Sequence, residues 1–356
     1  MHAERLSPHD LAAGGHLRLA GAVLLAPVRI GARVIAKGTR LDHTLAGVIA
    51  EAAANGTLTA PLRLAHPEIN DLHEDEAALR LARAVSGSGV QVGTPRQSRV
   101  DVTAGVDGVL RVNVAGLGQL NRIDPLEVFT LFHGQSVRAG DTVASVKVAP
   151  HLVPESSVAA GEAAARESAP VIAVDAYRPL AVAALAAESL PRDGLERFEL
   201  AARTKVSSLG GRFLGVTQVA AEEPAVALAD LTAALRRLAL EQRIPLLLVG
   251  GVSAGDPLSP FYGALEASGG HVLRRGVPAH PGSMIWLASL ADTTILGLPQ
   301  CGMFSMATAA DLVLPRLLTG EQVTPDTLAD LGHGGLLGKE MRFRFPDYAR
   351  DLDSPP

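Results

Sequence analysis

One stretch decides the fold: Pro245-Leu246-Leu247-Leu248-Val249, followed by Gly250-Gly251-Val252-Ser253-Ala254-Gly255-Asp256. A short continuous apolar run that ends in glycines predicts a buried strand followed by a loop. In a parallel α/β sheet, ligands bind beyond the carboxyl ends of the strands, where glycines let backbone N–H groups approach an anion. We therefore expect Ser253 to donate to a ligand oxygen, and Asp256 to hold Mg²⁺ or cap the next helix. A plain strand-to-helix turn is the alternative.

Strand-like and helix-like segments alternate on both sides of this loop, and they predict a three-layer α/β domain with a mostly parallel sheet over residues 170–325. The predicted strands are 171–174, 180–185, 213–219, 245–249, 271–275 and 293–296, and the predicted helices are 194–209, 224–240, 260–268 and 305–318. The apolar run after Met284 is also expected to be helical. Residues 326–356 mix charge with glycine and predict a loosely packed C-terminal tail.

Two further loops follow strands of the same predicted sheet. One is PAHPGSM at 278–284, with His280 and Ser283 as its polar groups, and the other is GLPQCGMFS at 297–305. We expect the three loops to converge on one crevice at the carboxyl edge of the sheet. For the second loop, a turn with a surface histidine is the alternative. Cys301 is expected to be an inert buried thiol, with a nucleophile or metal ligand as the alternative.

Residues 1–150 predict a mixed α+β accessory domain. The runs 99–104 and 109–114 alternate polar and apolar residues, and Asp107-Gly108 between them predicts a β-hairpin. Residues 73–85 predict an amphipathic helix with an acidic first turn. Residues 151–169 are rich in alanine and small polar residues, and predict a linker, helical from 154, between the two domains.

Composition excludes several classes of protein. The formal net charge of -5 over 356 residues argues against nucleic-acid binding, which usually requires a basic face. The chain has one cysteine, which fits a reducing cytoplasm and excludes an intrachain disulfide. Since no run of about 18 apolar residues occurs, no membrane segment is expected. We expect a cytoplasmic protein whose ligand is a small molecule.

The order GGVSAGD (250–256), PAHPGSM (278–284), GLPQCGM (297–303) resembles the molybdopterin-binding domain of the molybdopterin molybdenumtransferase and gephyrin family. That family has a Gly-Gly-Val-Ser-Val-Gly loop, a Lys-Pro-Gly-Lys-Pro loop and a Gly-Leu-Pro-Gly-Asn-Pro loop at similar separations. The resemblance covers roughly Leu180–Leu318. It implies a protein of molybdenum cofactor biosynthesis, usually a homodimer, that binds molybdopterin, its adenylated form or the finished cofactor. The implied cofactor-binding residues are Gly250, Gly251, Val252, Ser253, Gly255, His280, Pro281, Gly282, Ser283, Pro299, Gly302 and Ser305.

The resemblance also implies an acidic, Mg²⁺-dependent reaction centre. Glu188 keeps one carboxylate of the family's Gly-Asp-Glu turn, and Glu222-Glu223 stands in place of an aspartate pair. The implied metal ligands are Glu188 and Asp256, and the implied catalytic residues are Asp256, Glu222 and Glu223. The family's reaction inserts molybdenum into adenylated molybdopterin with Mg²⁺ and releases AMP.

The chain departs from the family where positive charge is needed. His280 and Ser283 stand in place of both lysines of the second loop, and a histidine carries only part of a positive charge near neutral pH. Three functions therefore stay open: a metal-inserting transferase, a non-catalytic carrier that supports maturation of a recipient molybdoenzyme, and, ranked lowest, a cofactor nucleotidyltransferase.

Overall fold

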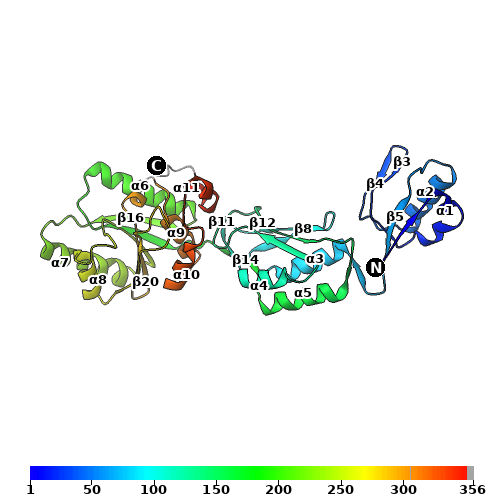
Figure 1. The fold of residues 1–356 in the computed structure, drawn as a ribbon. Helices are drawn as coiled ribbons and strands as arrows, with labels where there is room; N and C mark the ends of the chain where they lie inside the picture. Colours follow the sequence, from blue (N-terminus) through cyan, green and yellow to red (C-terminus); the bar gives the residue numbers. More distant parts are fainter. Residues whose placement is uncertain (305, 351–356) are drawn as a thin grey trace. The chain divides into compact units, whose positions relative to one another are not determined.

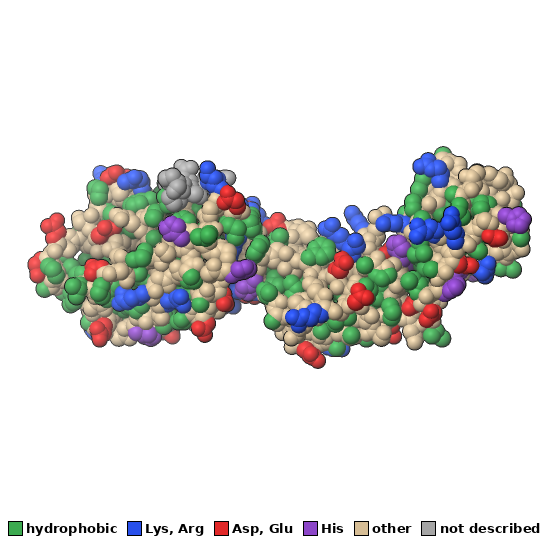
Figure 2. Space-filling model, in the orientation of Figure 1, with side chains coloured by type: hydrophobic (Ala, Val, Ile, Leu, Met, Phe, Trp, Pro, Cys, Tyr) green, Lys and Arg blue, Asp and Glu red, His purple; other side chains and the backbone are tan. Residues whose placement is uncertain are grey.

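The computed structural model describes residues 1–304 and 306–350. Within these ranges, no helix combines the length and apolar character needed to cross a membrane. The chain forms two compact units. The N-terminal unit comprises residues 1–106, 111–133 and 139–174, and the C-terminal unit comprises residues 107–110, 134–138 and 175 onward. On the face shown in Figure 2, acidic, basic and apolar side chains are interspersed over the C-terminal unit.

The N-terminal unit is built from small antiparallel sheets and helices (Figure 1). Its sheets have the strand orders β1-β5-β2, β3-β4, β6-β13 and β10-β12-β8-β7. The strands are β1 (His2–Leu6), β2 (Val23–Leu24), β3 (Val28–Ile30), β4 (Arg33–Ile35), β5 (Leu62–His66), β6 (Asp71–His73), β7 (Val90–Val92), β8 (Arg99–Ala104), β10 (Leu126–Thr130), β12 (Thr142–Val148) and β13 (Leu152–Pro154). The helices are α1 (Pro8–Ala12), α2 (His43–Ala54), α3 (Glu74–Val85), α4 (Val114–Leu120) and α5 (Glu155–Glu167).

Helices α3 and α5 form where their sequence patterns predict them. Helix α3 has three acidic residues in its first turn and buries Ala77, Leu81 and Val85, which lie four residues apart on one face. Helix α5, in the segment predicted as a linker, belongs to the N-terminal unit. Arg80 of α3 donates to both carboxylate oxygens of Glu162 on α5, at 2.9 and 3.0 Å.

The predicted hairpin at Asp107-Gly108 is wrong. Strand β8 pairs with β7 and β12, whereas β9 (Gly108–Val112) lies in another sheet between β11 (Ser136–Val137) and β14 (Ile172–Ala176). Gly108 does not adopt the positive φ of a tight turn. A Cβ there would lie 2.0 Å from the carbonyl oxygen of Asp175, so the glycine permits close approach of two backbones.

The C-terminal unit contains a six-stranded sheet of order β16-β15-β17-β20-β19-β18. Strands β16, β15, β17 and β20 are parallel, and β19 is antiparallel to both of its neighbours. The strands are β15 (Ala181–Ala186), β16 (Arg212–Gln218), β17 (Leu246–Gly250), β18 (His271–Arg275), β19 (Trp286–Leu290) and β20 (Thr293–Gly297). The helices are α6 (Arg192–Ser208), α7 (Pro224–Leu235), α8 (Pro260–Ala267), α9 (Ala310–Leu318), α10 (Pro325–Ala329) and α11 (Asp347–Arg350).

Helices cover both faces of this sheet (Figure 1), and alternate residues of β17 pack into two different cores. Leu246 and Leu248 of β17 pack in one core with α6 and α9. Leu247 and Val249 pack in the other core with α7 and α8. A strand buried on both faces needs apolar residues at every position, which explains the continuous run at 245–249. The C-terminal unit therefore has the predicted three-layer α/β fold with a mostly parallel sheet.

The helix predicted after Met284 is wrong, because this run forms strand β19. Leu290 pairs with Thr293 of β20, so Ala291 and Asp292 form a two-residue hairpin turn in which Ala291 has φ 49°. Periodicity alone cannot separate a short buried strand from a buried helix segment. The pairing with β18 and β20 decides the matter here.

Residues 326–350 are well packed, in contrast to the loose tail that the sequence predicts. Leu337 and Phe345 are each 1% exposed and belong to the core that contains α6 and α9. The predicted helix at 305–318 begins only at Ala310. The tail contains no long helix, but apolar side chains spaced irregularly among its charged residues pack into the core.

Candidate functional site

A cavity of about 380 Å³, here called the loop cavity, lies at the carboxyl edge of the sheet where β15, β17 and β20 end. Strand β18 also ends at this edge, because β19 is antiparallel to both β18 and β20. Residues from all three glycine-containing loops contribute to its wall. The lining residues are Glu188, Gly251, Val252, Ser253, Met284, Leu298, Pro299, Gln300 and Cys301.

The first loop needs glycine at position 251. Gly251 has φ +80°, and a Cβ there would lie 2.7 Å from Cγ of Glu188. The glycine therefore lets the backbone turn while the Glu188 side chain lies directly against it.

Hydrogen bonds from neighbouring elements hold the first loop in place. The buried indole Nε1 of Trp286 donates to the carbonyl oxygen of Val252 at 3.0 Å. The Tyr262 hydroxyl donates to the carbonyl oxygen of Ser253 at 3.0 Å, and the amide of Gly255 donates to Ser253 Oγ at 3.1 Å. The Ser253 hydroxyl acts as an acceptor in this bond, so its proton is available to a ligand.

Tyr262 is held as a hydrogen-bond donor by its surroundings. Burial raises the pKa of the Tyr262 hydroxyl, although the nearby Arg275 guanidinium opposes the rise. That guanidinium lies 3.9 Å from the centre of the Tyr262 ring. The phenol therefore stays protonated near neutral pH and keeps its bond to the Ser253 carbonyl.

The third loop lies against the first. A Cβ on Gly250 would lie 2.4 Å from Cε of Met303, so Met303 packs on bare backbone. Cys301, predicted to be buried, is exposed and lines the cavity. It begins the short 3-10 helix η3 (Cys301–Met303), which turns the thiol toward solvent while Gly302 and Met303 are buried. Gly302 does not line the cavity.

The second loop reaches the cavity only through its last residue, Met284. His280 is exposed, and its backbone pairs with the tail: its N–H donates to the Gly335 carbonyl and its carbonyl accepts from Leu337, both at 2.7 Å. Pro281 and Gly282 are buried, and the Pro281 carbonyl accepts from the Ala309 amide at 2.8 Å. The Ser283 carbonyl accepts from Val277 at 2.9 Å. The side chains of His280 and Ser283 therefore lie outside the cavity wall.

Among the predicted acidic residues, Glu188 alone lines the cavity. Asp256 is exposed and accepts from the Leu258 amide at 3.0 Å. Glu223 caps α7 by accepting from the Val226 amide at 2.8 Å, and Glu222 is exposed beside it. Over residues 1–304 and 306–350, no three His, Cys, Asp or Glu side chains gather as a metal site would require. The chain's own side chains thus fit Mg²⁺ only if a bound ligand supplies further oxygens.

Several lining and bracing residues are absent from the sequence-based set. Gln300 and Met284 could have been chosen because they lie within the quoted loops, but their side-chain directions cannot be read from spacing. Trp286 and Tyr262 brace the first loop from β19 and α8, and no local pattern marks them. Ser305, predicted to bind cofactor, lies outside the described residues.

The loop cavity depends on a close contact between Gly297 and Trp286. A Cβ on Gly297 would lie 1.9 Å from Cε2 of Trp286. We expect Gly297→Ala to lower the free energy of unfolding by about 1–3 kcal/mol, because the indole must move and release the Val252 carbonyl. Urea unfolding followed by tryptophan fluorescence measures this. Gly194→Ala, where the new Cβ would make ordinary contacts of 3.4 Å or more, is the control. Equal stability of the two variants would contradict the expectation.

The sequence matches no protein-family model and no curated protein. Its solved structural neighbours include the molybdopterin biosynthesis enzyme MoaB from Thermus thermophilus, with 21% sequence identity and a TM-score of 0.28. That match covers 40% of this chain and 98% of the other. Another neighbour is the molybdopterin biosynthesis MoeA protein from Pyrococcus horikoshii, with 14% identity, a TM-score of 0.27, and 71% and 75% of the two chains covered. At these TM-scores, the likenesses establish neither a family nor a function for the chain.

Proposed function

We propose that the C-terminal unit binds a phosphate-bearing pterin of the molybdopterin class in the loop cavity, and that the chain acts in molybdenum cofactor biosynthesis as a carrier. The observation that carries this proposal is the meeting of three loops in one cavity. Ser253, Met284 and Pro299 come from the three loops whose order and sequence resemble the molybdopterin-binding family, and all three line it.

The lining chemistry suits a flat heterocycle with polar edges. Val252, Met284, Leu298 and Pro299 provide apolar walls against which a ring can pack. The Ser253 hydroxyl and the Gln300 amide can hydrogen-bond to the edge of the ring. Ligand sites commonly combine such walls with a small number of orienting polar groups.

A phosphate in this cavity would face the carboxylate of Glu188, and no lysine or arginine is among the lining residues. Direct contact between two anions is unfavourable, whereas Mg²⁺ between them neutralises both. Mg²⁺ sites commonly use one or two carboxylates together with substrate phosphates and retained waters. We therefore propose that Mg²⁺ enters with the ligand and is held by Glu188.

Insertion of molybdenum with release of AMP is the second candidate function, and the position of Glu188 favours it. The carrier function ranks first because Asp256, Glu222 and Glu223 do not line the cavity. A carrier needs no second acid or base. Nucleotidyl transfer ranks last, since a triphosphate would meet no basic side chain there.

The binding proposal is tested by incubating the full chain with molybdopterin under anaerobic conditions, with and without Mg²⁺. The retained pterin is then measured by its fluorescence after oxidation. We expect Mg²⁺ to strengthen retention by wild type about tenfold or more, and Glu188→Gln to abolish that dependence. Glu222→Gln, a carboxylate outside the cavity, is the matched control and should behave as wild type. If the amount of retained pterin changed neither with Mg²⁺ nor with Glu188→Gln, the metal assignment would be overturned.

Cys301 offers an independent readout of the same cavity, because it is the chain's single cysteine and is exposed. Bound molybdopterin should slow its alkylation. Unchanged alkylation, with no pterin retained, would refute binding at this site. Carrier and transferase are then separated by adding molybdate to the chain loaded with adenylated molybdopterin: AMP release identifies the transferase, and stable retention identifies the carrier.

A further inference from the structure

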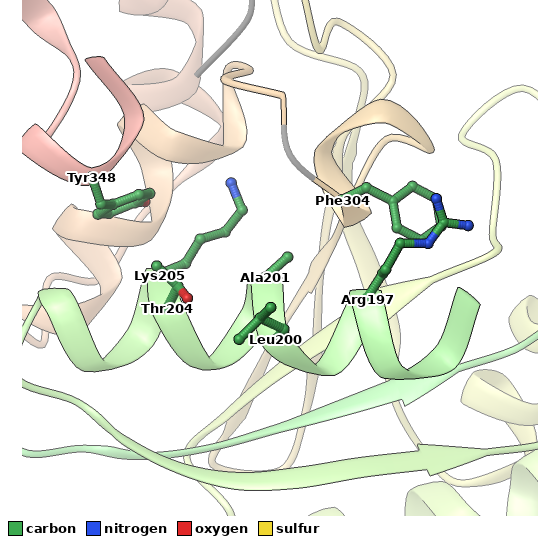
Figure 3. A pocket seen from close by; sticks show the side chains of 7 residues that line it. All are labelled: Arg197, Leu200, Ala201, Thr204, Lys205, Phe304 and Tyr348. Carbon is green, nitrogen blue, oxygen red and sulfur yellow. The ribbon is translucent and has the colours of Figure 1, made fainter. Parts of the chain in front are cut away.

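The C-terminal unit contains a second cavity, of about 270 Å³, lined by side chains of α6 and α11 and by Phe304 (Figure 3). We call it the α6 cavity. Its lining residues are Arg197, Leu200, Ala201, Thr204, Lys205, Phe304 and Tyr348. None of them lines the loop cavity. Figure 3 shows Tyr348 of α11 and Phe304 on opposite sides, with Ala201 and the amine of Lys205 between them.

The polar group of this cavity is the buried ammonium of Lys205. Its side chain is 3% exposed, and Nζ donates to Oδ1 of Asp311 at 2.5 Å. Asp311 also accepts from the Tyr348 hydroxyl and from the Thr308 amide, each at 2.9 Å. An ammonium has three N–H donors. Within the described residues 1–304 and 306–350, the Lys205 ammonium uses one of them, to Asp311. Lys205 lines the cavity and has two further N–H donors.

A second cation lies at the exposed end of the cavity. The side chain of Arg197 is 66% exposed, and its guanidinium lies 5.3 Å from the centre of the Phe304 ring. Its carboxylate neighbour, Asp193, is 3.6 Å away and 77% exposed, so this ion pair is weak and exchangeable. Arg197 and Lys205 lie eight residues apart on α6, about 12 Å along the helix axis, so one carboxylate cannot contact both cations.

The remaining wall is apolar and partly aromatic. Leu200 is 63% exposed, and the small side chain of Ala201 beside it leaves room for an occupant. The rings of Phe304 and Tyr348 can pack against a third ring in offset or edge-on geometry. Because the volume is below the roughly 300–1,000 Å³ of drug-sized sites, a single ring fits better than a fused system with long substituents.

We propose that the α6 cavity binds a small aromatic monocarboxylate, at a site distinct from the loop cavity. The ring lies between Phe304 and Tyr348, and the carboxylate accepts a hydrogen bond from Lys205. A single negative charge is preferred over two, since the Asp311 carboxylate is close behind Lys205. This site goes beyond the proposed pterin function and does not depend on it.

The test is calorimetric titration of the full chain with phenylacetate, and with 2-phenylethanol as its uncharged counterpart. We expect phenylacetate to bind at least tenfold more tightly than the alcohol, because only the acid accepts charge-assisted hydrogen bonds. Ala201→Phe fills the cavity and should abolish binding.

The matched control is Ala233→Phe, which places the same ring on an exposed position of α7 and should bind as wild type. Binding by Ala201→Phe equal to that of wild type would overturn the assigned site. Equal affinity for the acid and the alcohol would overturn the assigned chemistry. Absence of any binding at millimolar phenylacetate would overturn both.

Discussion

Replacing Asp311 with alanine is expected to lower the free energy of unfolding of the C-terminal unit by about 3–5 kcal/mol. Asp311 is 0% exposed and accepts hydrogen bonds from Lys205, Tyr348 and Thr308. Its removal leaves the Lys205 ammonium buried without a counter-ion, and it also leaves two further donors without their acceptor. Burial and the Asp311 carboxylate together raise the pKa of the Tyr348 hydroxyl, so this donor stays protonated.

Urea unfolding measured by tryptophan fluorescence reports on this unit alone, because Trp286 is the chain's single tryptophan and is 1% exposed. Asp193→Ala is the control on an exposed carboxylate, and should change stability by less than about 1 kcal/mol. The double variant Lys205→Met with Asp311→Leu should lose less unfolding free energy than the two single variants lose together. The reason is that the double variant buries no unpaired charge. Equal losses for Asp311→Ala and Asp193→Ala would refute the role of the buried pair.

Phe345→Ala is expected to cost about 3–5 kcal/mol of unfolding free energy, although it lies in a segment whose sequence suggests a loose tail. Phe345 is 1% exposed within the core that contains α6 and α9, and its removal leaves a cavity there. The same urea experiment measures the loss.

Phe343→Ala provides the internal control, because Phe343 lies two residues away in the same tail and is 41% exposed. Phe343→Ala should lower the free energy of unfolding clearly less than Phe345→Ala does. If both changes proved nearly neutral, residues 326–350 would not be part of the core, and Tyr348 could not form a fixed wall of the α6 cavity.

Much of the C-terminal unit could be predicted from local sequence. The apolar run 245–249 predicted β17, and the glycines after it predicted a loop at the carboxyl edge of the sheet. Glu188, which the family resemblance implied as a metal ligand, lines the loop cavity. The strand and loop predictions succeeded because strand burial and backbone turns depend mainly on neighbouring residues.

Pairing with other elements decided the remaining features. Gly108 meets the backbone of Asp175 instead of forming a turn, and the run 286–290 becomes a strand because β18 and β20 flank it. His280 lies outside the cavity wall because its backbone pairs with Gly335 and Leu337 of the tail. No pattern within a loop can encode a contact made by a segment more than fifty residues away.

The amino-acid sequence by itself determined most of the strands and helices in the α/β unit, with the exception of strand β19, and at which edge of the sheet the glycine loops end. Only the tertiary structure decided which side chains of those loops face a shared cavity: Met284 and Cys301 do, whereas His280, Ser283 and Asp256 do not. The physical reason is that apolar periodicity reports burial along one element, whereas the direction of a loop side chain depends on every element packed against that loop.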